Sequence, residues 1–195
     1  MSSVFADRLV TLRDGARVVV RALHAGDAEA VCAHLARAAA TTDQVLTSPG
    51  ETVSAAALRR DFERVFDAER GGIMLGAFAI EDPRRVVGHI GLAMRDKKKV
   101  AHMGSLGMIY DEEWRGRGLG TVMLGDIIGW ARAHPRVMRV ELEALETNAA
   151  GLALYRRCGF ERDGLKRRAF RQASGAFVDV VLMSMWVGAE TEPRS

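Results

Sequence analysis

Two scarcities in the chain limit what it can be. Cysteine occurs only as Cys32 and Cys158 among 195 residues, and two thiols without a secretion signal indicate reduced, packed side chains instead of a disulfide framework. No apolar run reaches the ~18 residues of a membrane span, and residues 1–10 lack the basic start and long apolar centre of a signal peptide. We therefore expect a cytoplasmic protein with no membrane partner.

Lysine and aromatic residues are also scarce. Lysine supplies four of the 28 basic residues, and aromatic residues make up 6% of the chain. The net charge of +3 is modest, and the basic clusters at 97–99 and 166–171 are not interleaved with the exposed aromatics on which single-stranded nucleic acids stack. The sequence therefore predicts no nucleic-acid partner, and we expect no metal cofactor either.

The chain does have enough apolar sequence for one core. Hydrophobic residues make up 48% of it, which predicts a single domain over 1–188 and a polar tail at 189–195. Periodicity predicts strands at 9–12, 17–21, 73–80, 86–94, 100–110, 137–145, 161–172 and 176–187, and helices after Asp27, around Leu58, at 122–134 and after Asn148. This order predicts an α/β fold with a mixed sheet. Asp27 is expected to cap a helix whose inner face holds Ala28, Val31, Cys32 and Leu35.

A glycine-rich segment, Trp114 to Thr121, follows an apolar run at 103–110 and precedes the helical pattern at 122–134. A glycine-rich turn at a helix start leaves backbone N–H groups unpaired, and with the helix dipole they form a site for phosphate. The dinucleotide fingerprint does not fit, because its third glycine would have to be Met123. The P-loop pattern does not fit either, because no lysine follows Gly120. A nucleotide-binding α/β domain of another kind stays an alternative.

A second segment, residues 137–160, contains a strand pattern, then a helix. Asn148 is a good helix cap, Leu152 and Tyr155 follow on one side of the helix, and Gly159 ends it. The two segments together resemble the GNAT acyltransferase superfamily. Residues 115–120 fit the pattern [QR]-x-x-G-x-[GA] of that family's coenzyme A pyrophosphate loop, and the strand–Asn–helix segment matches with Leu154–Tyr155 and Gly159–Phe160.

The resemblance extends from about Arg17 to Val187 and implies a fold. This is a single-domain GNAT-like α/β fold, with a mixed, mostly antiparallel central sheet and helices on both faces. The strand before the glycine loop and the strand before Asn148 would splay apart, and the acyl-pantetheine arm would insert between them. Gly104 and Gly107, in the first of these strands, are consistent with a close backbone approach, although core packing would also explain them.

The resemblance also implies an activity, the transfer of an acetyl group from acetyl-CoA to a primary amine by direct attack. Holding amine and thioester together would supply most of the acceleration, and backbone N–H groups at 108–110 would polarise the carbonyl. Tyr155 would protonate the departing thiolate, since a phenol with a pKa near ~10 is protonated at neutral pH. The residues implied at the acetyl-CoA site are Met108, Ile109, Tyr110, Arg115, Gly116, Arg117, Gly118, Leu119, Gly120, Thr121, Asn148 and Tyr155.

The chain departs from the family at the general base. Many GNAT enzymes carry a glutamate just ahead of a Leu–Gly pair, but here Gly104 and Ser105 precede Leu106–Gly107. The remaining candidates are Glu141, Glu143, Asp179, His89 and His102. Each of them also has a structural reading, and a water chain is a further alternative. The missing glutamate leaves open a non-catalytic acyl-CoA-binding protein, against which Tyr155 argues.

The acceptor is indicated only loosely. The end of the chain, with Gly175, Phe177, Asp179 and Met183 or Met185, resembles the GNAT branch that acetylates protein N-termini, polyamines and related amines. We therefore expect a small-molecule or peptide amine as the acceptor, and a homodimer is compatible with the sequence.

Overall fold

The computed structural model describes residues 5–44, 51, 53–66 and 72–189. Eight strands form one sheet in the order β1-β2-β3-β4-β5-β6-β8-β7. The strands are β1 Arg8–Thr11, β2 Arg17–Ala22, β3 Ile73–Ala79, β4 Asp82–Met94, β5 Met103–Tyr110, β6 Arg139–Leu145, β7 Glu161–Arg171 and β8 Phe177–Trp186. The helices are α1 Ala28–Thr41, α2 Ala55–Arg64, α3 Leu119–Ala133 and α4 Ala149–Arg157. Of the predicted polar tail, only residue 189 lies within the described residues.

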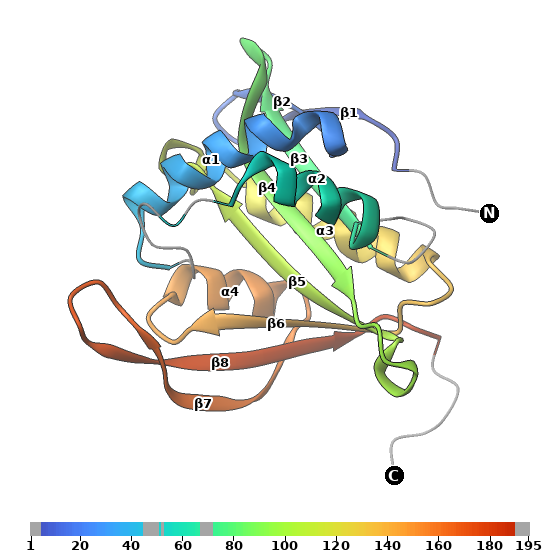
Figure 1. The fold of residues 1–195 in the computed structure, drawn as a ribbon, viewed down its shortest axis with the longest axis vertical. Coiled ribbons are helices and arrows are strands. Elements are labelled where there is room, and N and C mark those ends of the chain that lie inside the picture. The colour runs from blue at the N-terminus through green and yellow to red at the C-terminus, as the bar shows by residue number, and fades with distance from the viewer. Residues whose placement is uncertain (1–4, 45–50, 52, 67–71, 190–195) are drawn as a thin grey trace.

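The sheet is antiparallel except at its centre, where β5 and β6 run parallel. These two strands pair only between Met103–Ser105 and Arg139–Glu141, and beyond that point they diverge (Figure 1). The remaining part of β5, residues 106–110, is hydrogen-bonded to β4 alone. The predicted mixed sheet with splayed middle strands is confirmed.

Helices cover both faces of the sheet, with α1 and α2 in front of it and α3 behind it in Figure 1. The larger core cluster joins α3 and α4, through residues such as Met123 and Leu152, to Ile90 and Leu92 of β4. The smaller cluster joins α1 and α2 to Met74 of β3 and to neighbouring apolar residues. Apolar burial on both faces is what fixes the register of the central strands. Among the described residues, no helix is both long enough and apolar enough to cross a membrane.

The start of α1 differs from the prediction. Asp27 occupies the N-cap position, but its carboxylate makes no capping hydrogen bond. It accepts hydrogen bonds from the Arg21 guanidinium at 2.7 and 2.8 Å and from the His24 backbone N–H at 3.0 Å. The buried face of α1 also includes His34, which is fully buried. The apolar pattern missed it because a histidine on a helix reads as polar.

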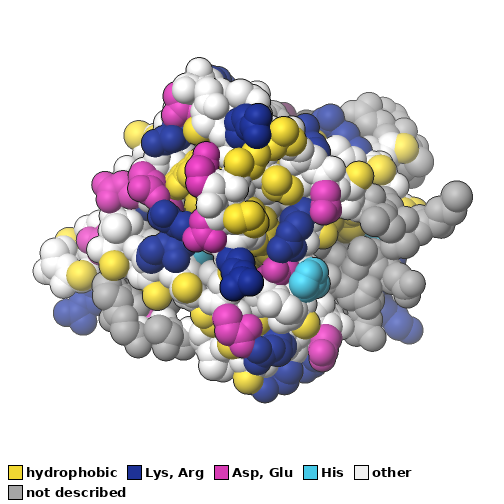
Figure 2. Space-filling view, turned by 90° about the horizontal axis from the view of Figure 1, so that it is seen from above, with side chains coloured by type: hydrophobic (Ala, Val, Ile, Leu, Met, Phe, Trp, Pro, Cys, Tyr) yellow, Lys and Arg dark blue, Asp and Glu magenta, His cyan; other side chains and the backbone are white. Residues whose placement is uncertain are grey.

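Charges of both signs are mixed on the surface. In the view from above, basic and acidic side chains lie among one another around a few apolar groups (Figure 2). Pairs such as Arg85–Glu113, at 2.5 Å, account for part of this mixing. On the face seen there, neither sign forms a continuous patch.

Candidate active site

The glycine loop is built as a phosphate-binding turn would be. After a short 3-10 helix at Glu112–Trp114, the chain passes through Gly116 and Gly118, whose φ angles are +75° and +93°. A side chain is strained in this left-handed region, so glycine is required here. Gly118 is the N-cap of α3 and supplies no side-chain cap. The first backbone N–H groups of α3 are therefore left for water or a ligand.

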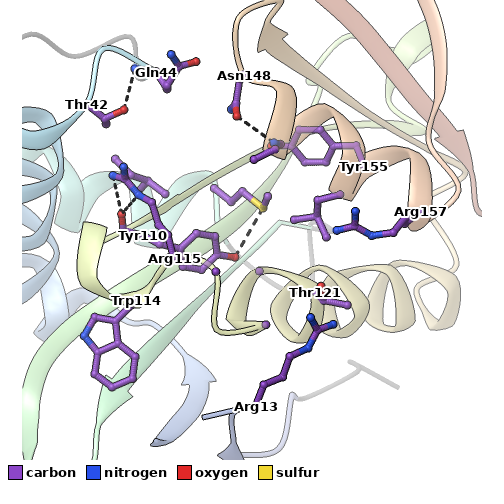
Figure 3. Close-up of a pocket in the computed structure, with 18 residues that line it drawn as sticks. Arg13, Thr42, Gln44, Tyr110, Trp114, Arg115, Thr121, Asn148, Tyr155 and Arg157 are labelled. Carbon is purple, nitrogen blue, oxygen red and sulfur yellow. Dashed lines mark hydrogen bonds between the residues drawn. The ribbon is translucent and has the colours of Figure 1, made fainter.

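A cavity of about 320 Å³, which we call the loop cavity, opens over this turn. It is bounded by the loop, the end of β5 and the first turn of α4 (Figure 3). The structure brings together ten of the twelve predicted acetyl-CoA residues here, namely Met108, Ile109, Tyr110, Arg115, Gly116, Gly118, Gly120, Thr121, Asn148 and Tyr155.

The other two predicted residues do not line the loop cavity. The Leu119 side chain is 1% exposed and belongs to the hydrophobic core. The Arg117 guanidinium lies 3.1 Å from the Asp14 carboxylate and stacks over the Trp114 ring. The predicted contribution of these two residues to acetyl-CoA binding is therefore limited to their backbone N–H groups.

Three arginines surround the loop cavity, and the motif predicted only one of them. Arg115 donates two hydrogen bonds of 3.1 Å to the carbonyl of Tyr110, at the end of β5. Arg13 comes from the β1–β2 turn, and its backbone N–H donates to the Arg117 carbonyl at 3.2 Å. Arg157 comes from the last turn of α4. Three positive charges beside free N–H groups favour an anionic ligand.

A second cavity, of about 420 Å³, lies against β4, β5 and β6, and we call it the sheet cavity. On β4 the lining residues, His89, Gly91 and Ala93, alternate along the strand, whereas on β5 the consecutive residues 105–109 line the cavity; in register, His89 pairs with Ile109 and Gly91 with Gly107. Apolar residues form most of the rest, among them Leu35, Phe66, Met74, Leu145, Phe170 and Val180. The two cavities share Gln44, Met108, Ile109, Asn148 and Tyr155. They therefore meet where β5 and β6 separate.

The two glycines predicted to mark a close backbone approach have different roles. A Cβ on Gly107 would meet nothing within 4 Å, so this glycine leaves the sheet cavity open. A Cβ on Gly104 would lie 2.7 Å from Leu92 and 3.0 Å from the sulfur of Met94. At Gly104 the core-packing reading is therefore correct.

Asn148 and Tyr155 are held by α4. The Asn148 side chain accepts a hydrogen bond of 2.9 Å from the Gly151 backbone N–H, which confirms its predicted role as the cap. The Tyr155 ring packs edge-on against Phe160, with ring centroids 5.9 Å apart, and the residue is 7% exposed. Burial raises the pKa of Tyr155 to about 12, so the hydroxyl is protonated at neutral pH.

Of the five candidate bases, only His89 and Glu143 line the sheet cavity. Glu143 is at the surface, with its side chain 57% exposed and 2.5 Å from the Lys166 ammonium. His89 is 9% exposed, and burial together with the neighbouring His34 lowers its pKa to about 3. The other three have roles elsewhere: Glu141 pairs with Arg95, Asp179 accepts from the backbone N–H of Arg168, and His102 packs against Trp186.

Comparison with known proteins agrees with this geometry. Residues 17–161 match the family described as "Acetyltransferase (GNAT) domain". Over 118 residues the chain is 30% identical to the L-amino acid N-acetyltransferase AaaT of Escherichia coli, covering 60% of this chain and 70% of that protein. Over 66 residues it is 44% identical to the N-alpha-acetyltransferase RimI of Mycobacterium tuberculosis, covering 34% and 39% of the two chains.

Solved structures share the fold. A GNAT-family acetyltransferase from Streptococcus pneumoniae superposes with a TM-score of 0.80 at 24% identity, covering 87% of this chain and 99% of that one. A phosphinothricin acetyltransferase from Sinorhizobium meliloti, in complex with AcCoA, superposes with a TM-score of 0.78 at 18% identity, covering 91% and 94%.

Proposed function

The chain belongs to the GNAT acetyltransferase family, and on that premise we propose that it transfers the acetyl group of acetyl-CoA to a primary amine. The observation on which this proposal depends is that two cavities meet at shared residues, among them Tyr155 and Asn148. A donor and an acceptor bound one in each cavity would touch where the cavities meet. Holding two reactants in contact supplies a large part of the acceleration of such a reaction.

The loop cavity suits the donor. The unpaired N–H groups at the start of α3 and the guanidinium groups of Arg13, Arg115 and Arg157 would hold the pyrophosphate. From there the acyl-pantetheine arm would run along residues 106–110 of β5, which do not pair with β6. Backbone N–H groups on that edge would polarise the thioester carbonyl.

The sheet cavity suits an acceptor amine that carries an apolar group. Its walls are mainly apolar. The carboxylate of Glu143, which lines this cavity, is paired with Lys166 at the surface. An apolar side chain would gain about 25 cal/mol for each Å² of apolar surface that it buries there. AaaT is named for L-amino acids and RimI for N-alpha-acetylation, so apolar amino acids and peptides that begin with them are the first acceptors to test.

Tyr155 would act as the general acid. Attack of the amine on the thioester expels a thiolate, and this thiolate needs one proton. The Tyr155 hydroxyl is protonated at neutral pH, and Tyr155 lines both cavities. The burial that makes the phenol a weaker acid also makes a thiolate in the same cavity a stronger base, so transfer between them stays feasible.

A thiol-release assay with acetyl-CoA tests this proposal over a panel of amines. The panel contains apolar L-amino acids, peptides with apolar N-terminal residues, polyamines, and the N-acetylated form of each as a blank. Titration calorimetry with acetyl-CoA, CoA, NAD and ATP runs alongside. We expect binding of acetyl-CoA and CoA, and thiol release with apolar amines. Binding without release on any amine would favour the non-catalytic alternative, and binding of NAD or ATP alone would contradict the proposal.

A further inference from the structure

We propose that the sheet cavity selects an acceptor amine with a large apolar side chain, such as that of leucine or phenylalanine, and that Gly107 sets the upper limit of its size. The proposal deepens the proposed function and rests on it, since it names the amines that the site takes. The evidence is an uncovered stretch in the middle of the sheet, where Gly107 lies.

The strand β5 is the fifth of eight in the sheet, yet one of its faces is left uncovered. Ser105 and Gly107 are exposed, although Leu106 between them is buried in the core cluster that contains α3. Side chains alternate along a strand, so the exposed positions lie on the face opposite to α3, and both line the sheet cavity. Since helices cover both faces of this sheet, exposed positions on a central strand mark space that packing leaves free for a ligand.

Small residues form the floor of the cavity at this point. Gly91 of β4 pairs in register with Gly107 of β5, and Ala93 pairs with Ser105. These four positions carry only a hydrogen atom, a methyl group or a hydroxymethyl group, and all four line the sheet cavity. The floor is therefore low across both strands.

The two paired glycines differ in what surrounds them. A Cβ on Gly91 would lie 3.1 Å from Cε1 of Phe66 and 3.3 Å from Cε of Met74, so Gly91 allows these two side chains to pack closely over the strand. A Cβ on Gly107 would meet nothing within 4 Å. A side chain of the acceptor can therefore occupy the space above Gly107, but only while residue 107 has no side chain of its own.

The walls around this space are apolar and come from both sides of the central strands. They include Leu35 of α1, Phe66 after α2 and Met74 of β3, and across the cavity Leu145 of β6, Phe170 of β7 and Val180 of β8. An aromatic side chain buries about 150–250 Å² when it is enclosed, and burial of apolar surface favours binding in proportion to its area. A large apolar side chain therefore gains more from these walls than the side chain of alanine or the hydrogen atom of glycine.

One polar side chain interrupts the apolar lining. His89 is 9% exposed, and its Nδ1 is buried without a hydrogen-bond partner among the described residues. Burial, together with the neighbouring His34, lowers the pKa of His89, so its ring is neutral. An unpartnered polar atom beside a cavity indicates that a ligand or a water molecule completes its contacts. An α-amino compound carries polar groups next to its side chain and suits such a lining.

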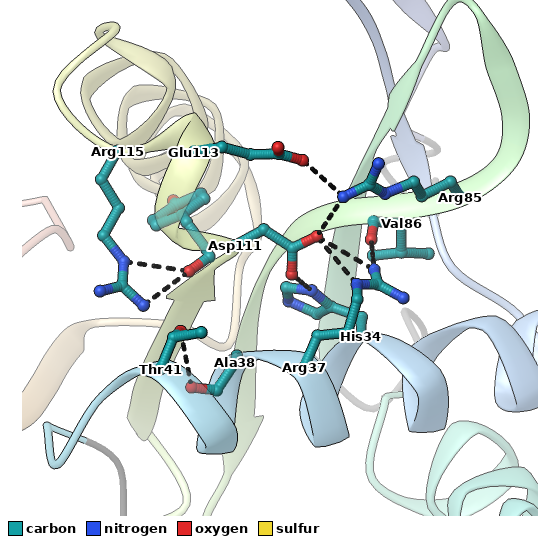
Figure 4. A network of polar contacts seen from close by, with 10 residues as sticks. His34, Arg37, Ala38, Thr41, Arg85, Val86, Asp111, Glu113 and Arg115 are labelled. Atoms are coloured by element: carbon teal, nitrogen blue, oxygen red, sulfur yellow. Dashed lines mark hydrogen bonds and ion pairs between the residues drawn. The ribbon is translucent and has the colours of Figure 1, made fainter.

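The α1 wall is held in place, which a cavity needs if it is to discriminate by size. Asp111, directly after β5, lies 2.8 Å from Nδ1 of the fully buried His34 and accepts a hydrogen bond from Arg37 at 3.1 Å (Figure 4). Arg37 also donates to the carbonyl of Val86 in β4 at 2.7 Å. Burial alone would raise the pKa of Asp111, but the hydrogen bond from His34 and the charges of His34 and Arg37 lower it overall. The carboxylate is therefore ionised at neutral pH and ties α1 to the sheet on both sides of Leu35.

Gly107→Ala tests the size limit, because it adds one methyl group to open space. The acceptors are glycine, alanine, leucine and phenylalanine, each as the free amino acid and as the amide, and kcat/KM is measured for each by thiol release. One methylene in an apolar pocket changes kcat/KM by about 10–200-fold. We expect the wild type to prefer leucine and phenylalanine over glycine by at least the lower figure. Gly107→Ala should lose a factor in this range on these two and less on glycine and alanine, and Gly107→Val should extend the loss to alanine.

Gly129→Ala is the matched control. A Cβ on Gly129 of α3 also meets nothing within 4 Å, and the residue lines neither cavity. This variant should keep the acceptor preference of the wild type. Thermal unfolding should show Gly107→Ala to be at least as stable as the wild type, because alanine loses less conformational freedom than glycine on entering a strand. The KM for acetyl-CoA should stay close to the wild-type value in both alanine variants.

An unchanged preference in Gly107→Ala overturns the proposal. An equal loss on all four acceptors does so too, since the methyl group would then block acetyl-CoA and not the acceptor side chain. A wild type that prefers glycine, or that acetylates polyamines but none of these four acceptors, also overturns it. If the wild type acetylates no amine at all, the proposed function fails before Gly107 is in question.

Discussion

Asn148 and Tyr155 are seven residues apart on α4, and both line the loop cavity and the sheet cavity. Seven residues make about two turns of an α-helix, so the two side chains project from the same side. The register of one short helix thus sets both groups at the junction of the cavities. A substitution at Asn148, the cap of this helix, should therefore also change the position of Tyr155.

The two roles of Asn148, as the helix cap and as a group that contacts the ligand, can be tested separately. Asn148→Ala removes the acceptor of the Gly151 N–H and should cost ~1 kcal/mol of stability. Asn148→Asp keeps that acceptor, so we expect it to restore stability but not the affinity for acetyl-CoA. Ser54→Ala is the matched control, because Ser54 caps α2 through Ala57 and lines neither cavity. Unfolding curves and calorimetry measure both effects, and full recovery of affinity by Asn148→Asp would reduce Asn148 to a cap.

The glycines of α3 should respond differently to the same added methyl group. Gly120 lines the loop cavity, and a Cβ there would lie 3.1 Å from Leu154. We expect Gly120→Ala to weaken acetyl-CoA binding without unfolding the protein, since alanine favours a helix by ~1 kcal/mol over glycine. Gly125→Ala adds the same group to open space and should raise stability at unchanged affinity. Equal affinities for the two variants would place the pyrophosphate elsewhere.

Gly118 should be more sensitive than Gly120. Its φ of +93° would strain any side chain, and a Cβ would lie 3.3 Å from the Arg13 side chain. We expect Gly118→Ala to lose ~1–2 kcal/mol of stability and also affinity, because the loop must shift to relieve the strain. Thermal unfolding with and without CoA separates the two losses. An unchanged stability would mean that the loop holds a different backbone conformation.

The contributions of Asp111 and Asp126 to the stability of the folded protein should depend on pH in opposite ways. The pKa of Asp111 is lowered overall, so its contribution is present above its unfolded pKa and is lost as the pH falls through the folded value. Burial raises the pKa of Asp126 despite the pairing with Arg8, so its contribution is present at low pH and is lost as the pH rises. Asp111→Asn should therefore be less stable by about 1–3 kcal/mol at pH 7 and approach the wild type in acid. Asp126→Asn should not lose stability at pH 7. Denaturant unfolding from pH 3 to 7 measures both.

Local pattern was sufficient for much of the fold and for one side of the site. The glycine turn and the Asn148 cap depend on residues close in sequence, and the structure has both. The splayed β5 and β6 were implied by the family resemblance, and the structure has these as well. The motif specifies a backbone path and not side-chain contacts, and in this chain the side chains of Arg117 and Leu119 face Asp14 and the core.

The acceptor side could not be predicted in the same way. His34 and Asp111 are 77 residues apart in sequence, and only the packing of α1 against the sheet brings them together. His89 was one candidate of five, and only the tertiary fold shows that it is buried and lines the sheet cavity. Arg13 likewise reaches the glycine loop through the β1–β2 turn, and no local signal marks that contact. Contacts of this kind can be predicted only from the tertiary fold, because the partners come from separate elements.

Tyr155→Phe tests the general acid. The substitution keeps the ring, its contact with Phe160 and nearly its volume, and removes only the hydroxyl. We expect turnover to fall by ~10²–10⁴-fold, with little change in the binding of CoA. Because the phenol has a pKa of about 12, wild-type turnover should show no loss from this group as the pH rises from 7 to 10. Steady-state kinetics over that range, with thermal unfolding of each variant, is the measurement.

Tyr110 provides the comparison, since it is the other tyrosine of the chain and lines the loop cavity. Its hydroxyl donates to the Met108 sulfur at 3.6 Å, and burial raises its pKa above the usual range for tyrosine. Only Tyr155 also lines the sheet cavity, where the amine would attack. Tyr110→Phe should therefore reduce turnover much less than Tyr155→Phe. A larger loss for Tyr110→Phe would transfer the acid role to Tyr110, and unchanged turnover in both variants would leave water as the proton donor to the thiolate.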